Sequence, residues 1–319
     1  MIAKLLPNRV RRMYLGGGRI DSFTGVKADE ADGVPRPEDW LASTTAAFNG
    51  SREVADEGFG HLSDGRLVSE VAGQLPILVK LLDSEERLVI QAHPTIPCAN
   101  RLFGSHVGKT ECWYFLPGTA DDAHVYLGFK PGVTREMWRA AFESQEGLLD
   151  MLHRIPVKSG DFVFVDGGVP HAIGAGCFMV ELQEPSDLMV VAERFTPSGR
   201  RIPDVKIHGG IGWEKMFDVY GYDTFDFEEV CRRYVRPSHS FRGSANVSCI
   251  CGTDLTDKFR MWRIAGDGCL NLSNHGSVAV VTEGAARVNG VAVETGDRLL
   301  AVDERCIEVQ GNATLVVCA

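Results

Sequence analysis

The sequence predicts a mainly β protein, arranged as a sandwich or barrel, with one helical insertion and a smaller second β module. Short apolar runs recur along most of its 319 residues, separated by Gly, Asp, Asn or Pro. Only one long interval has helical periodicity. No glycine-rich phosphate loop opens a helix, because LGGGR at residues 15–19 fits neither of the common spacings. Alternating βαβ units and a nucleotide-dependent enzyme are therefore disfavoured.

The predicted strands lie on both sides of the helical interval. They are RLVIQAH, CWYFL and HVYLGF before it, and DFVFV, CFMVELQ, DLMVVAERF, SVAVV and ATLVVCA after it. The main helix is predicted over residues 133–155, where apolar residues return every three or four positions and Thr134 can cap the first turn. A shorter helix is predicted over residues 226–235.

An internal echo predicts that the two β modules are related. SGDFVFVDGG at residues 159–168 resembles TGDRLLAVDE at residues 295–304, and in both a Gly-Asp pair opens the strand. Only the first copy continues to Pro170-His171. The turn-forming segment RPSHSFRGSA at residues 236–245 marks a boundary. We therefore expect a chemically active domain over residues 1–240, with the helical insertion around 133–155, and a β module over 241–319 without metal ligands.

The composition narrows the classes of partner. A formal net charge of −10 and a pI near 5.4 argue against a non-specific nucleic-acid binder, which needs a basic face. No apolar run approaches the roughly 18 residues of a membrane-spanning helix. The nine cysteines form no CxxC pair, and their odd number is typical of reduced intracellular thiols. We expect a cytoplasmic protein with no nucleic-acid or membrane partner, and the sequence predicts no oligomeric state.

Polar side chains with metal-binding chemistry fall on three short β segments. Residues two apart on a strand share a face, so Gln91 and His93 project together, as do Lys109 and Glu111. A third segment places His171 at the start of a strand. Two imidazoles, a carboxylate and an amide oxygen suit zinc or a similar divalent ion, with one position open for water or substrate.

The segments IQAHP, GKTECWY, GDFVFVDGGVPHAIGAG and VELQEPSD, in this order, resemble the class I mannose-6-phosphate isomerases, which are cupins with a bound zinc. The resemblance is collinear from about residue 12 to residue 210. It implies a cupin fold (a double-stranded β-helix, or jelly roll) with a degenerate second module. It also implies one divalent metal ion, Zn²⁺, on Gln91, His93, Glu111 and His171.

The same resemblance implies an activity and further site residues. The activity is the interconversion of mannose 6-phosphate and fructose 6-phosphate through an enediol(ate), so the expected partner is a small sugar phosphate. Lys109 corresponds to an active-site lysine that acts in catalysis or holds the phosphate, and Glu181 corresponds to a glutamate proposed to transfer a proton. The segment EDWLAS places Ser43 near the sugar phosphate.

One departure from the family pattern concerns an arginine. The family places a catalytic arginine ten residues after the glutamate, where this chain has Val191. Arg194 replaces it only if a bulge or loop intervenes, because an odd offset points to the opposite face of a strand. The basic residues that follow, and that can reach a phosphate, are Arg200, Arg201 and Lys206. Two alternatives to the family reaction therefore stay open, an isomerase-like cupin for a different sugar or sugar phosphate and a non-catalytic sugar-binding protein.

Overall fold

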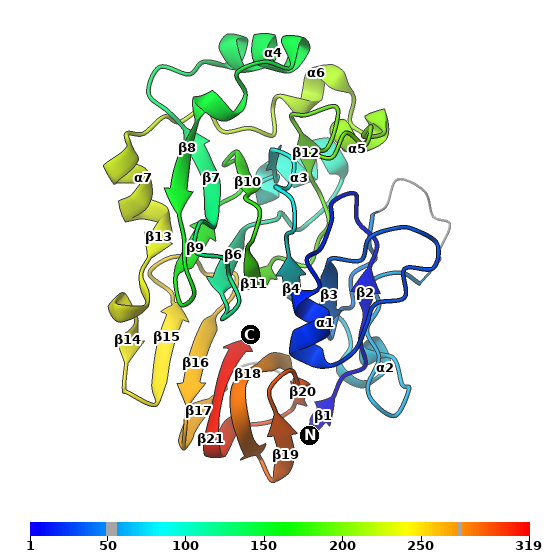
Figure 1. The fold of residues 1–319 in the computed structure, drawn as a ribbon, viewed down its shortest axis with the longest axis vertical. Helices are drawn as coiled ribbons and strands as arrows, with labels where there is room; N and C mark the ends of the chain where they lie inside the picture. Colours follow the sequence, from blue (N-terminus) through cyan, green and yellow to red (C-terminus); the bar gives the residue numbers. More distant parts are fainter. Residues whose placement is uncertain (49–55, 273–275) are drawn as a thin grey trace.

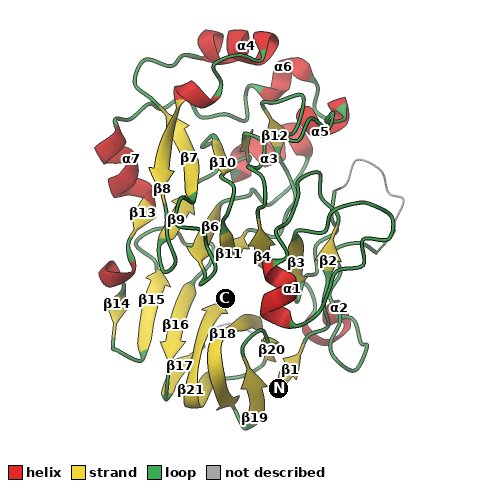
Figure 2. Cartoon of the chain, viewed as in Figure 1, coloured by secondary structure: helices red, strands yellow, loops and turns green. Residues whose placement is uncertain are grey.

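The computed structural model describes residues 1–48, 56–272 and 276–319 and contains three antiparallel sheets stacked along the long axis of the molecule (Figure 1). A layer of helices covers the five-stranded sheet, which packs on a seven-stranded sheet, and that sheet packs in turn on a nine-stranded sheet (Figure 2). The predicted mainly β fold with a helical insertion is thus confirmed.

The seven-stranded sheet is buried on both faces. Its strands, in spatial order, are β13 (Val235–Arg236), β9 (Phe162–Val165), β6 (Glu111–Phe115), β11 (Phe178–Gln183), β4 (Leu78–Asp83), β3 (Glu38–Leu41) and β2 (Arg9–Val10). In β6, Cys112 and Tyr114 pack toward the nine-stranded sheet, whereas Trp113 and Phe115 pack toward the five-stranded one. Burial of alternate residues on opposite faces explains why these strands are nearly continuous apolar runs.

The five-stranded sheet supports the helical layer on its outer face. Its strands are β12 (Val190–Val191), β5 (Gln91–Ala92), β10 (His171–Ile173), β7 (His124–Phe129) and β8 (Leu152–Pro156). Trp138 and Phe142 of the helical layer pack with Ala172 of the sheet in one buried cluster. The helices of the described chain are α1 (Arg19–Thr24), α2 (Val68–Ala72), α3 (Ile96–Phe103), α4 (Arg135–Ser144), α5 (Asp204–Ile207), α6 (Trp213–Met216) and α7 (Phe227–Tyr234). Of these, α1 and α2 lie away from the helical layer, and their residues Ile20 and Val68 pack in the cluster between the other two sheets.

The main predicted helix is half as long as expected. It begins as predicted, with the Thr134 hydroxyl accepting the N–H of Met137 at 3.3 Å, and continues as α4. It ends at Gln145, whose φ of +60° lies in the left-handed region. The prediction of helix over residues 145–155 was therefore wrong. The apolar residues there serve a 3₁₀ turn (Leu149–Met151) and strand β8, which pairs with β7. The helix predicted over 226–235 is α7, capped by Asp226.

The nine-stranded sheet forms the C-terminal module. Its strands are β1 (Ile2–Lys4), β20 (Arg298–Val302), β18 (Gly276–Val288), β21 (Cys306–Cys318), β16 (Met261–Ala265), β15 (Val247–Cys251) and β14 (Arg242–Gly243), with β17 (Gly268–Asn271) on β21 and β19 (Val291–Glu294) on β18. Strand β1 belongs to this sheet because Ile2 pairs with Ala301. The expected boundary at residue 240 therefore leaves out a strand from the opposite end of the sequence.

The two similar segments noted in the sequence, residues 159–168 and 295–304, begin with the same kind of turn. Before β9 the N–H of Lys158 donates to the Asp161 carboxylate at 3.1 Å, and before β20 the N–H of Glu294 donates to the Asp297 carboxylate at 2.8 Å. The preceding glycines, Gly160 and Gly296, have φ of +87° and +89°. Shared turn chemistry therefore underlies the sequence echo. Within the described ranges, no helix is long and apolar enough to cross a membrane.

Candidate metal centre and substrate pocket

Three predicted ligands converge between the five-stranded and seven-stranded sheets. His171 opens β10, where it pairs with Gln91 of β5, and His93 follows β5 directly. Glu111 opens β6 on the facing sheet. His93, Glu111 and His171 are each at most 1% exposed, and one ligand atom from each lies within 4.8 Å of the other two.

Close backbone approaches bring these segments together. A Cβ on Gly108 would meet the carbonyl oxygen of Pro94 at 2.7 Å, and a Cβ on Gly167 would meet the backbone of Thr95 at 2.9 Å. The N–H of Lys109 also donates to the carbonyl of Pro94 at 3.0 Å. Glycine at these two positions therefore allows the segments that carry His93, Glu111 and His171 to contact one another.

Both histidines present Nε2 to the centre of the cluster. The Nδ1 of His93 lies 2.9 Å from the carbonyl oxygen of Leu188, and the Nδ1 of His171 lies 2.9 Å from that of Val169. A carbonyl only accepts, so each Nδ1 carries the proton and each Nε2 keeps its lone pair. Burial lowers the pKa of His93, and burial lowers that of His171 to about 3. Both rings are therefore neutral and ready to ligate.

Glu111 supplies the negative charge. Burial opposes its ionisation, but the Lys109 ammonium overrides burial and holds the pKa of Glu111 well below its usual value. The Lys109 ammonium lies 2.8 Å from Glu111 Oε2 and 2.8 Å from His93 Nε2. Glu111 Oε1 and His171 Nε2, 3.3 Å apart, are buried and have no hydrogen-bond partner among the described residues. Two neutral imidazoles, one carboxylate and orphaned lone pairs fit a divalent cation.

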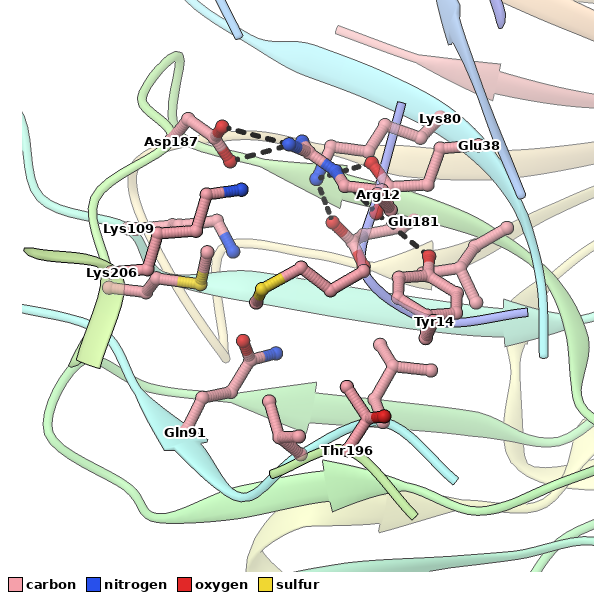
Figure 3. A pocket seen from close by; sticks show the side chains of 15 residues that line it. Arg12, Tyr14, Glu38, Lys80, Gln91, Lys109, Glu181, Asp187, Thr196 and Lys206 are labelled. Carbon is pink, nitrogen blue, oxygen red and sulfur yellow. Dashed lines mark hydrogen bonds and ion pairs between the residues drawn. The ribbon is translucent and has the colours of Figure 1, made fainter. Parts of the chain in front are cut away.

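A pocket adjoins this cluster through Lys109, which lines it together with the predicted ligand Gln91. In Figure 3, Lys109 and Lys206 point into the pocket from one side of the view, and Gln91 lies below them. Part of the pocket lining is apolar rather than charged. The apolar lining residues are Met13, Leu82, Leu88, Val89 and Met189.

The far side of the pocket holds a buried network of charges. Glu181 lies 2.7 Å from Lys80, and Arg12 reaches Glu38 at 3.0 Å and Asp187 at 3.2 Å (Figure 3). Burial raises the pKa of Glu181, although Lys80 opposes the shift. A buried carboxyl with a raised pKa at the edge of a pocket is a reasonable proton donor and acceptor.

Lys206 differs from the other cationic residues of the pocket. It is 5% exposed, and within the described chain its ammonium has no ion-pair partner within 4.0 Å. Burial, with Arg12 nearby, lowers its pKa to about 8. It can therefore offer an uncommitted positive charge to an anionic ligand near neutral pH.

Four other predicted substrate or catalytic residues lie elsewhere. The guanidinium of Arg194 lies over the rings of Phe142 and Trp213, at 5.0 and 5.8 Å from their centroids. Arg201 is exposed and pairs with Asp204, and Arg200 is also exposed. Ser43 is buried in a turn, where its hydroxyl lies 3.2 Å from the carbonyl oxygen of Thr45. None of the four is among the described residues that line the pocket.

Sequence reasoning missed most of the charge network. Arg12, Glu38 and Lys80 lie in ordinary strand-like stretches, and nothing in their spacing distinguishes them from surface residues. One signal was present, because Lys80 is a charged residue inside the apolar run ILVKLLD, which is predicted to be buried. A lysine in such a run needs a carboxylate partner, and here that partner is Glu181.

Comparisons with known proteins give a consistent result. No family model matches the chain. The mannose-6-phosphate isomerase ManA of Bacillus subtilis is 38% identical over 114 residues, which are 36% of this chain and 35% of that protein. The mannose-6-phosphate isomerase of Streptococcus mutans is 38% identical over 113 residues, or 35% of this chain and 34% of that protein. The matched segment thus spans about a third of these relatives.

Solved structures match over the whole chain. The mannose 6-phosphate isomerase of Bacillus subtilis aligns with 100% of this chain and 99% of its own, with a TM-score of 0.78 and 19% identity. A putative mannosephosphate isomerase from Archaeoglobus fulgidus aligns with 99% and 96%, with a TM-score of 0.70 and 17% identity. The chain therefore has the cupin fold of these isomerases, and the resemblance noted from its sequence is confirmed.

Proposed function

We propose that this protein is a metal-dependent aldose–ketose isomerase that interconverts mannose 6-phosphate and fructose 6-phosphate, with Zn²⁺ as its ion. The observation that carries the proposal is the buried cluster of His93, Glu111 and His171, which adjoins a pocket lined by Gln91, Lys109 and Glu181. The named relatives support the substrate class. The nine cysteines, all free thiols, support a reducing cytoplasm as its location.

The residues of the pocket suit this chemistry. His93, Glu111, His171 and the amide of Gln91 would hold the ion, which when bound supplies polarisation of the sugar's C1 and C2 oxygens. Lys109 would stabilise negative charge that develops on the sugar as the enediol(ate) forms. Glu181, which lines the same pocket with a raised pKa, would carry the proton between C1 and C2.

The phosphate of the sugar needs a positive charge that is not already neutralised. Arg12 and Lys80 are paired with carboxylates at 2.7 to 3.2 Å, whereas Lys206 has no such partner among the described residues. Lys206 is therefore the favoured phosphate contact. Ser43, Arg194, Arg200 and Arg201 remain predictions, and their positions do not favour a direct contact with a ligand in this pocket.

A second candidate is an isomerase-like cupin for a different sugar or sugar phosphate. It is favoured by Val191, which is fully buried in β12 beside Gln91, together with the apolar residues of the pocket lining. Val191 supplies no guanidinium to a ligand in the pocket. A less charged sugar would lose less binding free energy from that absence, and it would pack better against the apolar residues of the lining.

The deciding experiment is turnover of mannose 6-phosphate by protein that has been stripped of metal and reloaded with zinc. We expect fructose 6-phosphate to form, turnover to disappear on chelation, and activity to return with one zinc per chain. Stoichiometric zinc binding without turnover would reject the family reaction. A panel of free and phosphorylated hexoses and pentoses, assayed by the same product analysis, would then test the second candidate.

A further inference from the structure

The C-terminal module reaches the back of the strand that carries two residues of the site. Lys258 lies just before β16, and its ammonium donates to the Thr110 hydroxyl at 2.5 Å. Thr110 stands between Lys109 and Glu111, where the chain enters β6, and successive side chains of extended chain point to opposite sides. Lys109 lines the pocket and Thr110 does not, so Lys258 touches this segment on the side away from the pocket.

A buried carboxylate beside Lys258 fixes the backbone on either side of Lys109. Glu184, 5% exposed, accepts the N–H of Thr110 at 2.8 Å and that of Gly108 at 3.2 Å. The ammonium of Lys258 is 3.6 Å from the Glu184 carboxylate. Since a buried carboxylate is costly without a compensating charge, Lys258 offsets the burial of the Glu184 side chain that holds both peptide groups.

The same lysine also reaches the segment that leads to His171. The Thr110 hydroxyl donates to the Asp166 carboxylate at 3.3 Å, and the Lys258 ammonium is 3.9 Å from that carboxylate. Asp166 opens the turn before β10, where its carbonyl accepts the N–H of Val169 at 3.2 Å. One ammonium thus reaches side chains of both segments that bring Glu111 and His171 together.

We infer that Lys258 is a positioning residue for the metal centre, supplied by the C-terminal module. It sets the geometry of Lys109 and Glu111 from behind through Thr110 and Glu184, without touching the pocket. The part of this inference that concerns catalysis rests on the proposed isomerase function. The part that concerns metal affinity and backbone order does not, so each part has its own measurement.

The test uses Lys258→Met in the full chain, which keeps most of the apolar stem and removes the ammonium. We expect zinc affinity, measured by competition with a chromophoric chelator, to fall about tenfold, as is typical when a group that supports a ligand is lost. Amide exchange of residues 108–111 in the metal-free protein should accelerate by a similar factor. If the protein isomerises mannose 6-phosphate, kcat should fall about tenfold while KM stays within twofold.

Two further variants separate charge from bulk. Lys258→Arg should recover most of the zinc affinity because it restores the cation. Lys258→Gln, which can donate to Thr110 but carries no charge, should give intermediate values and keeps the test usable if the methionine variant does not fold. Zinc affinity and amide exchange within twofold of the parent in both Lys258→Met and Lys258→Gln would overturn the inference.

A matched control comes from the same loop. Asp254 pairs with Arg236 of β13 at 2.8 Å, so Arg236→Met removes a contact of that loop and leaves Lys258 in place. We expect zinc affinity and exchange within twofold of the parent, and an effect as large as that of Lys258→Met would reject a specific role. Absence of isomerase turnover in the parent, with the zinc and exchange effects present, would reject the proposed function and leave the positioning role standing.

Discussion

At the scale of single residues, the two histidines of the buried cluster have a defined protonation state, because a backbone carbonyl accepts the N–H of Nδ1 in each ring. The Nε2 of His171 is buried and has no hydrogen-bond partner among the described groups. We expect His171→Ala to lose zinc and turnover together, with zinc affinity at least a hundredfold weaker, since the remaining ligands bind weakly. Metal analysis and the isomerase assay measure this.

The control for that prediction is His153→Ala. His153 is also buried, and its Nε2 bonds the carbonyl of Phe225 at 2.8 Å, outside the cluster. This variant should keep one zinc per chain even if it unfolds more readily. Full zinc content and full turnover in His171→Ala would refute the metal centre.

Lys206 gives a prediction about pH. Its pKa is lowered to about 8 by burial, so the ammonium is charged below pH 8 and neutral above it. We expect KM for mannose 6-phosphate to rise as the pH passes 8, because the charge that binds phosphate is lost. Burial of that charge opposes folding below pH 8, and this cost fades as the pH rises toward the unfolded value of roughly 10.4.

The matched variant is Lys206→Gln. A charge-assisted hydrogen bond is worth about 1.5–3 kcal/mol, so its KM should rise roughly 10-fold to 150-fold and lose the dependence above pH 8. Steady-state kinetics from pH 6.5 to 9.5 would show this. An unchanged profile in the variant would assign the phosphate contact to another residue.

Part of the buried cluster could be predicted from sequence because strand alternation is strict over short distances. Residues two apart in extended chain share a face. This rule correctly predicted that the side chains of Lys109 and Glu111 lie together. Arg194 could not be placed in this way, because β12 ends at Val191 and the irregular chain beyond it carries the guanidinium onto the ring of Phe142. Partners such as Arg12 and Asp187, far apart in sequence, are joined only by the tertiary fold.

At the scale of elements, the short edge strand β12 determines what faces the predicted ligand Gln91. Val191 pairs directly with Gln91, so their side chains lie on the same face. If the family reaction is limited by the missing guanidinium, Val191→Arg should raise kcat for mannose 6-phosphate about tenfold or more. Val191→Met, similar in length and uncharged, is the control. Unchanged turnover in a folded Val191→Arg protein would show that another group already serves.

Element boundaries that depend on nearby residues, such as a helix cap, were predicted well. Boundaries that depend on pairing with a distant strand were not. Thr134 begins α4 in both prediction and structure, because a capping hydroxyl acts within one turn. The second half of the same periodic stretch became β8, because pairing with β7 outweighs helical spacing there. The two-residue strands β5 and β12 are much shorter than their apolar runs, since only Gln91 and Ala92 find partners on β12.

At the scale of the whole molecule, a buried ion pair joins the modules. Arg298 of β20 lies 2.7 Å from Asp39 of β3, and both side chains are at most 8% exposed. We expect Arg298→Met to lower the free energy of unfolding by about 3–5 kcal/mol, because it leaves a buried carboxylate without its cation. Urea unfolding measures this.

The comparison for that prediction is the exposed Arg139 on α4, which pairs with Glu143 and with Glu214. The removal of both exposed pairs by Arg139→Met should cost about 1 kcal/mol or less. The double variant Arg298→Met with Asp39→Asn should be less destabilised than Arg298→Met alone. Equal losses for the surface pairs and the buried pair would contradict the coupling of the modules through Arg298.

The pairing of β1 with β20 has a consequence for the order of folding. Ile2 and Ala301 are neighbours in a sheet although almost three hundred residues separate them, so this contact closes one of the largest loops in the chain. Contacts of such long range form late and slow the search for the native state. During synthesis, residues 2–4 therefore lack their pairing partner until β20 has been made. A nascent chain halted after residue 240 would expose this unpaired strand together with the apolar face of β6 and β11.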